Sequence, residues 1–161
     1  MKNMIALVLS IGCSGAFAAP ATLLERALEC KLADKDLASL MRELGAADGA
    51  MKKPATQIGA PTVDLYQLAA PVTAFGHSAS TVAVMPGRIL LAIDGATMDA
   101  ASAKLKLKEE SYGPSSREVR PTVSVVAFQL SAKPLAGKLL LGCQYGNPAT
   151  ATWVKADSFG F

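Results

Sequence analysis

The stretch STVAVMPGRILLAI, residues 80–93, decides the fold. Its two halves, 80–85 and 88–93, are rich in β-branched and aliphatic residues and have the length of strands. Pro86-Gly87 between them has the composition of a tight turn, and Asp94-Gly95 ends the second half. The stretch therefore predicts a β-hairpin.

Similar runs on both sides of this hairpin extend the predicted sheet. VDLYQL (63–68) and PVTAF (71–75) precede it, and PTVSVVAFQL (121–130) and KLLLGCQY (138–145) follow it. AKPLAG (132–137) has the composition of a turn between the last two runs. We expect each run to form one strand, with its aromatic side chains packed in the core.

Helices are expected before the sheet. Thr22 and Glu25 fit a capping box, which predicts a short helix over Leu23–Lys31. Asp34 is a suitable N-cap for a second helical segment, and Gly45 is a suitable end for it. The apolar residues of this second segment recur at helical spacing, at Leu37, Leu40, Met41 and Leu44.

The remaining segments are predicted as one further helix, two loops and a tail. Thr97 to Lys108 is expected to be helical, because DAASAK is a poor strand sequence. Residues 45–61 and 109–120 contain Gly, Pro and polar residues and are expected to be loops. A short strand is expected around Trp153 in the tail.

This order of elements predicts an α+β fold, with N-terminal helices, then a mainly antiparallel sheet with one further helix. The 161 residues are 51% hydrophobic and 18% charged, which is enough apolar surface for one folded domain. The formal charge of +3 is too small to indicate nucleic-acid binding. The basic run Lys104, Lys106 and Lys108 is interpreted as a solvated face.

The first 18 residues have the pattern of an export signal. Lys2 gives a positive start, residues 4–12 are a short apolar run, and Ala16-Phe17-Ala18 is a cleavage motif. Cleavage between Ala18 and Ala19 leaves residues 19–161 as a single periplasmic or secreted domain. The apolar run is shorter than the roughly 20 residues that a membrane span needs.

A second processing site is the alternative. Ser10-Ile11-Gly12-Cys13 resembles the lipobox of bacterial lipoproteins, in which the Cys becomes the lipidated first residue. The family pattern prefers Leu where this chain has Ser10. Lipidation at Cys13 would tether the protein to a membrane, which is the only membrane association that we expect.

Cys30 and Cys143 are the cysteines that remain after signal removal. An even number of cysteines in an oxidising compartment predicts a disulfide, here between the first helix and one of the last strands. The alternative is two buried free thiols. Two Cys and one His do not complete a tetrahedral zinc site, so we expect no metal and no cofactor.

Gly76-His77-Ser78-Ala79-Ser80 is the one stretch that resembles a catalytic motif, the G-x-S-x-G elbow of serine hydrolases. Ser80 replaces the final Gly, and a strand rather than a helix is expected after it. His77 is the only His, and neighbours on a strand point to opposite faces, so His77 is badly placed to activate Ser78. We therefore expect no catalytic residues.

Several features together resemble small exported proteins of Gram-negative bacteria. These features are the signal, an early helix ending in Glu29-Cys30, the apolar strands and the late segment Gly142-Cys143-Gln144-Tyr145. The order of helices before a sheet is also similar to modules of the β-lactamase-inhibitor-protein type. This resemblance implies a fold and transfers no binding residue.

The expected function is that of an exported, non-enzymatic binding or inhibitory module that interacts with an envelope protein. Two alternatives stay open. One is an envelope structural protein that is lipid-anchored at Cys13. The other is a small envelope hydrolase that uses Ser78.

The mass of the protein recovered from the envelope fraction tests its processing. We expect a chain that starts at Ala19 and gains two reactive thiols only after reduction. A diacylglyceryl-modified Cys13 at the start of the chain would instead establish the lipoprotein, and two thiols that react before reduction would exclude the disulfide.

Overall fold

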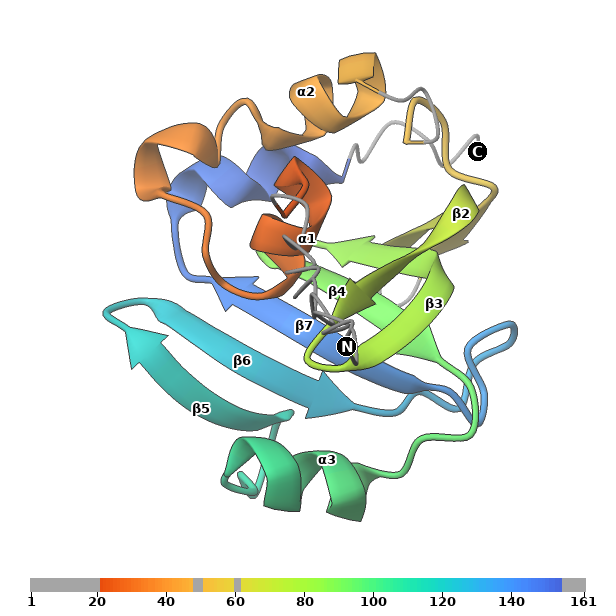
Figure 1. Ribbon diagram of the computed structural model, residues 1–161, viewed down its shortest axis with the longest axis vertical. Helices are drawn as coiled ribbons and strands as arrows, with labels where there is room; N and C mark the ends of the chain where they lie inside the picture. The colour runs from red at the N-terminus through yellow and green to blue at the C-terminus, as the bar shows by residue number, and fades with distance from the viewer. Residues whose placement is uncertain (1–20, 48–50, 60–61, 155–161) are drawn as a thin grey trace, which may run out of the picture.

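The computed structural model describes residues 21–47, 51–59 and 62–154 (Figure 1). In this part of the chain the fold is α+β, with mostly N-terminal helices, one later helix and a dominant seven-stranded antiparallel sheet. The predicted α+β class is thereby confirmed. The helical segments are α1 (Leu23–Leu28), η1 (Asp34–Asp36), α2 (Leu40–Ala47), α3 (Met98–Leu105) and η2 (Pro148–Trp153). The strands are β1 (Thr56–Gly59), β2 (Thr62–Ala74), β3 (His77–Met85), β4 (Arg88–Ile93), β5 (Ser115–Arg120), β6 (Val123–Phe128) and β7 (Leu139–Tyr145).

The sheet has the strand order β1-β2-β3-β4-β7-β6-β5, so β7, the last strand along the chain, lies between β4 and β6. β4 and β7 are paired from Arg88 opposite Gln144 to Ile93 opposite Leu139. Both strands are nearly continuous runs of buried residues, because both faces of the sheet are covered at its centre.

Apolar residues form one cluster on each face of the sheet. The larger cluster joins Ile89 and Leu91 of β4 to residues from all three α-helices and to Trp153 of η2. The smaller cluster contains Leu90 and packs against Leu135 of the β6–β7 connection. Figure 1 shows α2 and η2 at one end of the molecule and α3 at the other end, beside β5 and β6.

The hairpins explain why the strands pair in this register. β2 and β3 are joined by two residues, Phe75 and Gly76, which both have positive φ, of 53° and 77°. Such turns match the twist of antiparallel strands. The predicted hairpin over residues 80–93 is β3 and β4, and Gly87 takes the positive φ, of 71°, that its turn requires.

Gly142 allows the central strands to approach one another. It pairs with Leu90 on β4 and with Val126 on β6. A Cβ atom at this position would lie 2.7 Å from the Cα of Leu90 and closer still to the carbonyl oxygen of Ile89. Any side chain at Gly142 therefore collides with the backbone of β4.

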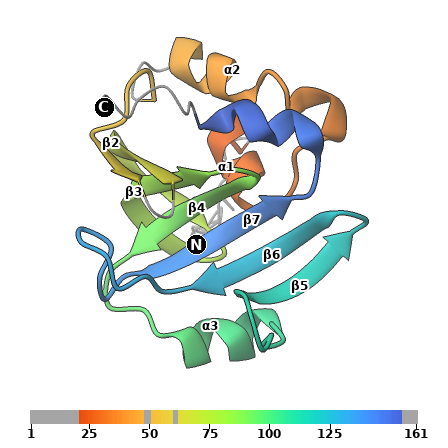
Figure 2. The ribbon, with the colours of Figure 1, turned by 180° about the vertical axis from the view of Figure 1, so that it is seen from behind.

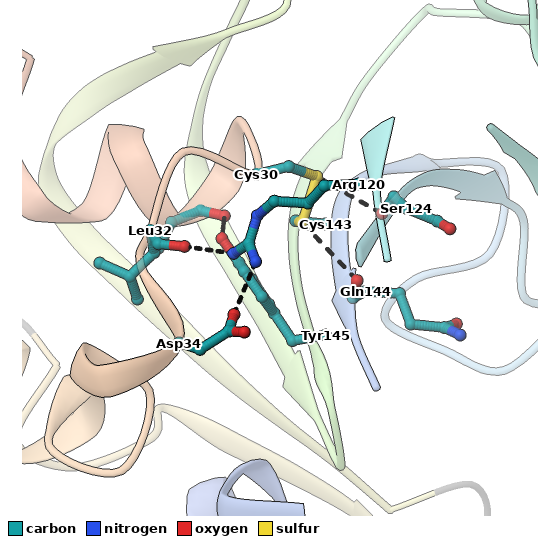
Figure 3. Close-up of a disulfide and its surroundings, with 9 residues drawn as sticks. Cys30, Leu32, Asp34, Arg120, Ser124, Cys143, Gln144 and Tyr145 are labelled. Atoms are coloured by element: carbon teal, nitrogen blue, oxygen red, sulfur yellow. Dashed lines mark hydrogen bonds and ion pairs between the residues drawn. A yellow bond between two sulfur atoms is a disulfide. The ribbon is translucent and has the colours of Figure 1, made fainter. Parts of the chain in front are cut away.

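Cys30 and Cys143 are bonded, which confirms the predicted disulfide across a sequence separation of 113 (Figure 3). Their Cα atoms are 5.2 Å apart. Cys30 follows the end of α1 in the left-handed region, with φ 63°, where glycine is usual. The Lys31 N–H donates to the Arg26 carbonyl at 2.8 Å and satisfies the end of the helix.

Two further interactions hold the end of α1 on the sheet. The Tyr145 hydroxyl donates to the Ala27 carbonyl at 2.8 Å, in a buried hydrogen bond. The Arg120 guanidinium at the end of β5 donates to the Leu32 carbonyl and, at 2.6 Å, to the Asp34 carboxylate. In Figure 3 Leu32, Asp34, Arg120 and Tyr145 lie together on one side of the disulfide.

The structure corrects the predictions for three segments. The predicted loops 45–61 and 109–120 contain β1 and β5, the two edge strands. β5 has the polar sequence SSREVR, which does not indicate a strand. This strand is stabilised mainly by its pairing with β6. Residues around Trp153 form η2 rather than a strand, with Asn147 as its side-chain cap.

Several predicted boundaries also change. VDLYQL and PVTAF are one strand, β2, with an irregular register between Gln67 and Val72. The first helix ends at Leu28, and Asp34 begins the short η1 while α2 begins only at Leu40. α3 ends at Leu105, because Lys106 has a left-handed φ of 54°.

Replacing both bonded cysteines by Ala should lower the free energy of unfolding by about 2–4 kcal/mol, because the unfolded chain loses a long covalent loop. Urea unfolding of the double variant and of the reduced wild type measures this loss. The matched double variant Cys30→Gly, Cys143→Ala should lose about 1 kcal/mol less, because Gly adopts the left-handed conformation freely. Equal unfolding midpoints for all these proteins would contradict the role of the disulfide.

Candidate functional site

A cavity of about 450 Å³ lies between α2, the segment before β1, β2 and η2, at the end of the molecule where Figure 2 shows α2 and η2 next to each other. Its volume is in the range of small-ligand sites. We call it the Asp64 cavity. It is lined by Ala38, Met41, Arg42, Met51, Lys52, Pro54, Gln57, Asp64, Tyr66, Thr152 and Trp153.

Asp64 is the unusual residue of this cavity, because it is a carboxylate with only 4% of its surface exposed. It lies in β2 opposite Gln57 of β1. The Gln57 side-chain amide donates to Asp64 Oδ1 at 2.7 Å. Among the described residues, no group donates to Asp64 Oδ2, and no buried side-chain oxygen there lacks a partner, so Oδ2 is an acceptor that reaches the solvent of the cavity.

Tyr66 is two residues further along β2 and shares the face of Asp64. Its burial, together with the nearby negative charge of Asp64, raises the pKa of Tyr66 to about 12. The phenol therefore keeps its proton in neutral solution and can donate a hydrogen bond. Its hydroxyl makes no hydrogen bond to any other part of the chain that the structure describes.

The apolar wall of the cavity includes Trp153, Met41 and Met51. The indole N–H of Trp153 donates to the Leu37 carbonyl at 2.9 Å, which joins η2 to the segment before α2. The Trp153 ring also meets the edge of Tyr145, with ring centroids 5.6 Å apart. Trp153 is the only Trp of the protein, so its fluorescence reports on this cavity specifically.

Two cations line the exposed part of the cavity. Arg42 of α2 and Lys52 are exposed, whereas Asp64 is buried. The charge therefore changes sign across the cavity, from a buried carboxylate to exposed basic side chains. This arrangement can bind a molecule, because it offers fixed polar partners beside an apolar wall.

The residues predicted from the sequence lie elsewhere. Ser78 is exposed in β3, and the adjacent His77 points to the opposite face of that strand. Neither lines the Asp64 cavity. Lys104 donates to the Phe75 carbonyl at 2.9 Å, so this residue of the basic run stabilises the β2–β3 turn. Cys13, Ala18 and Ala19 lie outside the described residues.

Sequence reasoning missed Asp64 and Tyr66. A signal was present, because Asp64 is the only charged residue of the run VDLYQL. A charged side chain inside an apolar strand either is exposed at a sheet edge or is buried, and a buried charge often marks a functional site. The strand prediction alone did not place Asp64 on the face that α2 and η2 cover.

No three His, Cys, Asp or Glu side chains among residues 21–47, 51–59 and 62–154 come together to hold a metal ion. In the same ranges, every helix is too short or too polar to cross a membrane.

Comparisons with protein-family models, with curated proteins and with solved structures found no match to this chain. The resemblance to small exported proteins of Gram-negative bacteria therefore stays a prediction.

The raised pKa of Tyr66 predicts a loss of stability in alkali. An unfolded Tyr ionises near pH 10, whereas folded Tyr66 holds its proton until about 12, so stability falls as the pH rises through this interval. Tyr66→Phe should lose less stability than the wild type between about pH 9 and pH 11.5. Urea midpoints at both pH values measure the difference, and parallel losses would contradict it.

Proposed function

We propose that this protein is an exported, non-enzymatic binding module of the bacterial envelope, and that the Asp64 cavity is its binding site. The N-terminal export pattern and the Cys30–Cys143 disulfide support the location, because disulfides persist in oxidising compartments. The occupant of the cavity is an envelope component, either free or presented by a protein partner.

One observation carries this proposal, namely a buried carboxylate that keeps an open acceptor at a cavity. Taking a charge out of water costs free energy unless a partner compensates for it. Gln57 supplies one neutral hydrogen bond to Asp64. A bound ligand with a donor group supplies further compensation, so occupancy stabilises the folded protein.

The composition of the cavity favours binding over hydrolysis. Its described lining residues include one carboxylate, Asp64, and no Ser, Cys or His, and the hydroxyl of its Thr152 donates to the Ala149 carbonyl at 3.1 Å. Glycoside hydrolysis by paired carboxylates needs two acids, and nucleophilic catalysis needs a nucleophile beside a base. The Ser78 alternative gains no support, because Ser78 and His77 point apart. A lipid anchor at Cys13 is compatible with the same binding site.

Ligand retention tests the proposal directly. The chain from Ala19 is incubated with an extract of envelope components, separated by gel filtration and denatured, and the released molecules are identified by mass spectrometry. We expect a stoichiometric ligand on the wild type and on the control Lys35→Ala, which changes an exposed cation outside the cavity.

The variant Ala38→Phe should lose this ligand, because the added ring occupies the cavity that Ala38 lines. Ala38 is exposed, so the variant should keep the wild-type circular dichroism and unfolding midpoint. A wild type that retains nothing, or a folded Ala38→Phe that retains the same ligand, would overturn the proposal.

A further inference from the structure

The charge layout of the Asp64 cavity defines the chemistry of its ligand, an inference that rests on the proposed function. We infer that the cavity takes a small zwitterion of the amino-acid or short-peptide class. The ammonium group of this ligand hydrogen-bonds to Asp64, and its carboxylate lies against Arg42 and Lys52.

The buried end of the cavity selects a positively charged donor. Asp64 has one oxygen bonded to Gln57, and its other oxygen is an acceptor without a partner in the described chain. An ammonium group has N–H donors for the free Asp64 oxygen and a charge opposite to that of the carboxylate. Such charge-assisted hydrogen bonds are stronger than neutral ones. An anionic group at this end would meet the Asp64 carboxylate without a compensating cation from β2.

The exposed end selects a negatively charged group. Arg42 and Lys52 both line the cavity, from α2 and from the segment before β1. A ligand with only a cationic group would pass these like charges to reach Asp64. A ligand with both charges satisfies the two ends together, so the carboxylate offsets the repulsion that the ammonium group meets.

The space and the walls fit a peptide of a few residues. The volume of about 450 Å³ exceeds what a single water or metal ion needs. Met41, Met51 and the Trp153 ring provide an apolar wall for an aliphatic side chain. The protonated Tyr66 hydroxyl can donate to a peptide carbonyl of the ligand.

A panel of dipeptides tests this inference by Trp153 fluorescence and calorimetry. The panel contains Gly-Gly, Leu-Ala, Met-Ala and Gln-Ala, whose side chains carry no charge, and the N-acetyl and C-terminal amide forms of each. We expect at least one free dipeptide to bind, with both of its blocked forms about tenfold or more weaker. Binding of the blocked forms with equal affinity would overturn the inference.

Two variants assign the two charges. Asp64→Asn should weaken the free dipeptide about tenfold and leave the N-acetyl form unchanged, because the second ligand has no ammonium group to lose. Arg42→Ala should remove the preference for the free acid over the amide. Asp99→Asn and Lys35→Ala are the matched controls, since both change exposed charges outside the cavity.

The outcomes separate this inference from the proposed function. Envelope extract could still yield a ligand that Ala38→Phe loses although no dipeptide binds. In that case the inference of a zwitterionic ligand is wrong, and the proposal of a binding module is retained. If the extract also yields no ligand, both fail. If a dipeptide binds equally to Asp64→Asn and to the wild type, the assignment of its ammonium group to Asp64 is wrong.

Discussion

The covalent bond between Cys30 and Cys143 is the interaction on which the helical side of this protein depends. α1, η1 and α2 contain 6, 3 and 8 residues, and such short helices are not stable alone in water. The bond fixes the end of α1 to β7 at the centre of the sheet, and the Tyr145 hydroxyl adds a second connection at Ala27. Further along the chain, α2 and one wall of the Asp64 cavity are held by the hydrogen bond from Trp153 to Leu37 and by Leu40 and Leu44, which are buried in the larger cluster.

The cavity lies where four parts of the chain meet, and different interactions hold each part in place. Asp64 and Tyr66 are fixed by the pairing of β2 with β1 and β3. Trp153 is held by its hydrogen bond to Leu37 and by its contact with Tyr145. The polar groups therefore come from a rigid sheet, while the cations come from α2 and the segment that precedes β1. Rigid polar groups lower the ordering cost of binding a small ligand.

The sequence predicted those parts of the fold whose local signals agree with their tertiary surroundings. The β3–β4 hairpin, the capped first helix and the disulfide follow from turn chemistry, a capping box and an even cysteine count. β5 was missed, because SSREVR is polar and becomes a strand only through its pairing with β6. The candidate site was missed for a related reason: the charge in VDLYQL marks Asp64 as unusual, but its burial beside a cavity depends on α2 and η2, which are distant in sequence.

The position of β7 in the sheet affects how the protein can fold during its synthesis on the ribosome. β7 is made last among the strands, yet it separates β4 from β6. At about 5–20 residues per second, Cys30 precedes Cys143 by on the order of ten seconds. During that interval the apolar edge of β4 has no neighbour and the Cys30 thiol has no partner. The nascent chain therefore has to be bound by a chaperone, or stay unfolded during export, until its final third has been made.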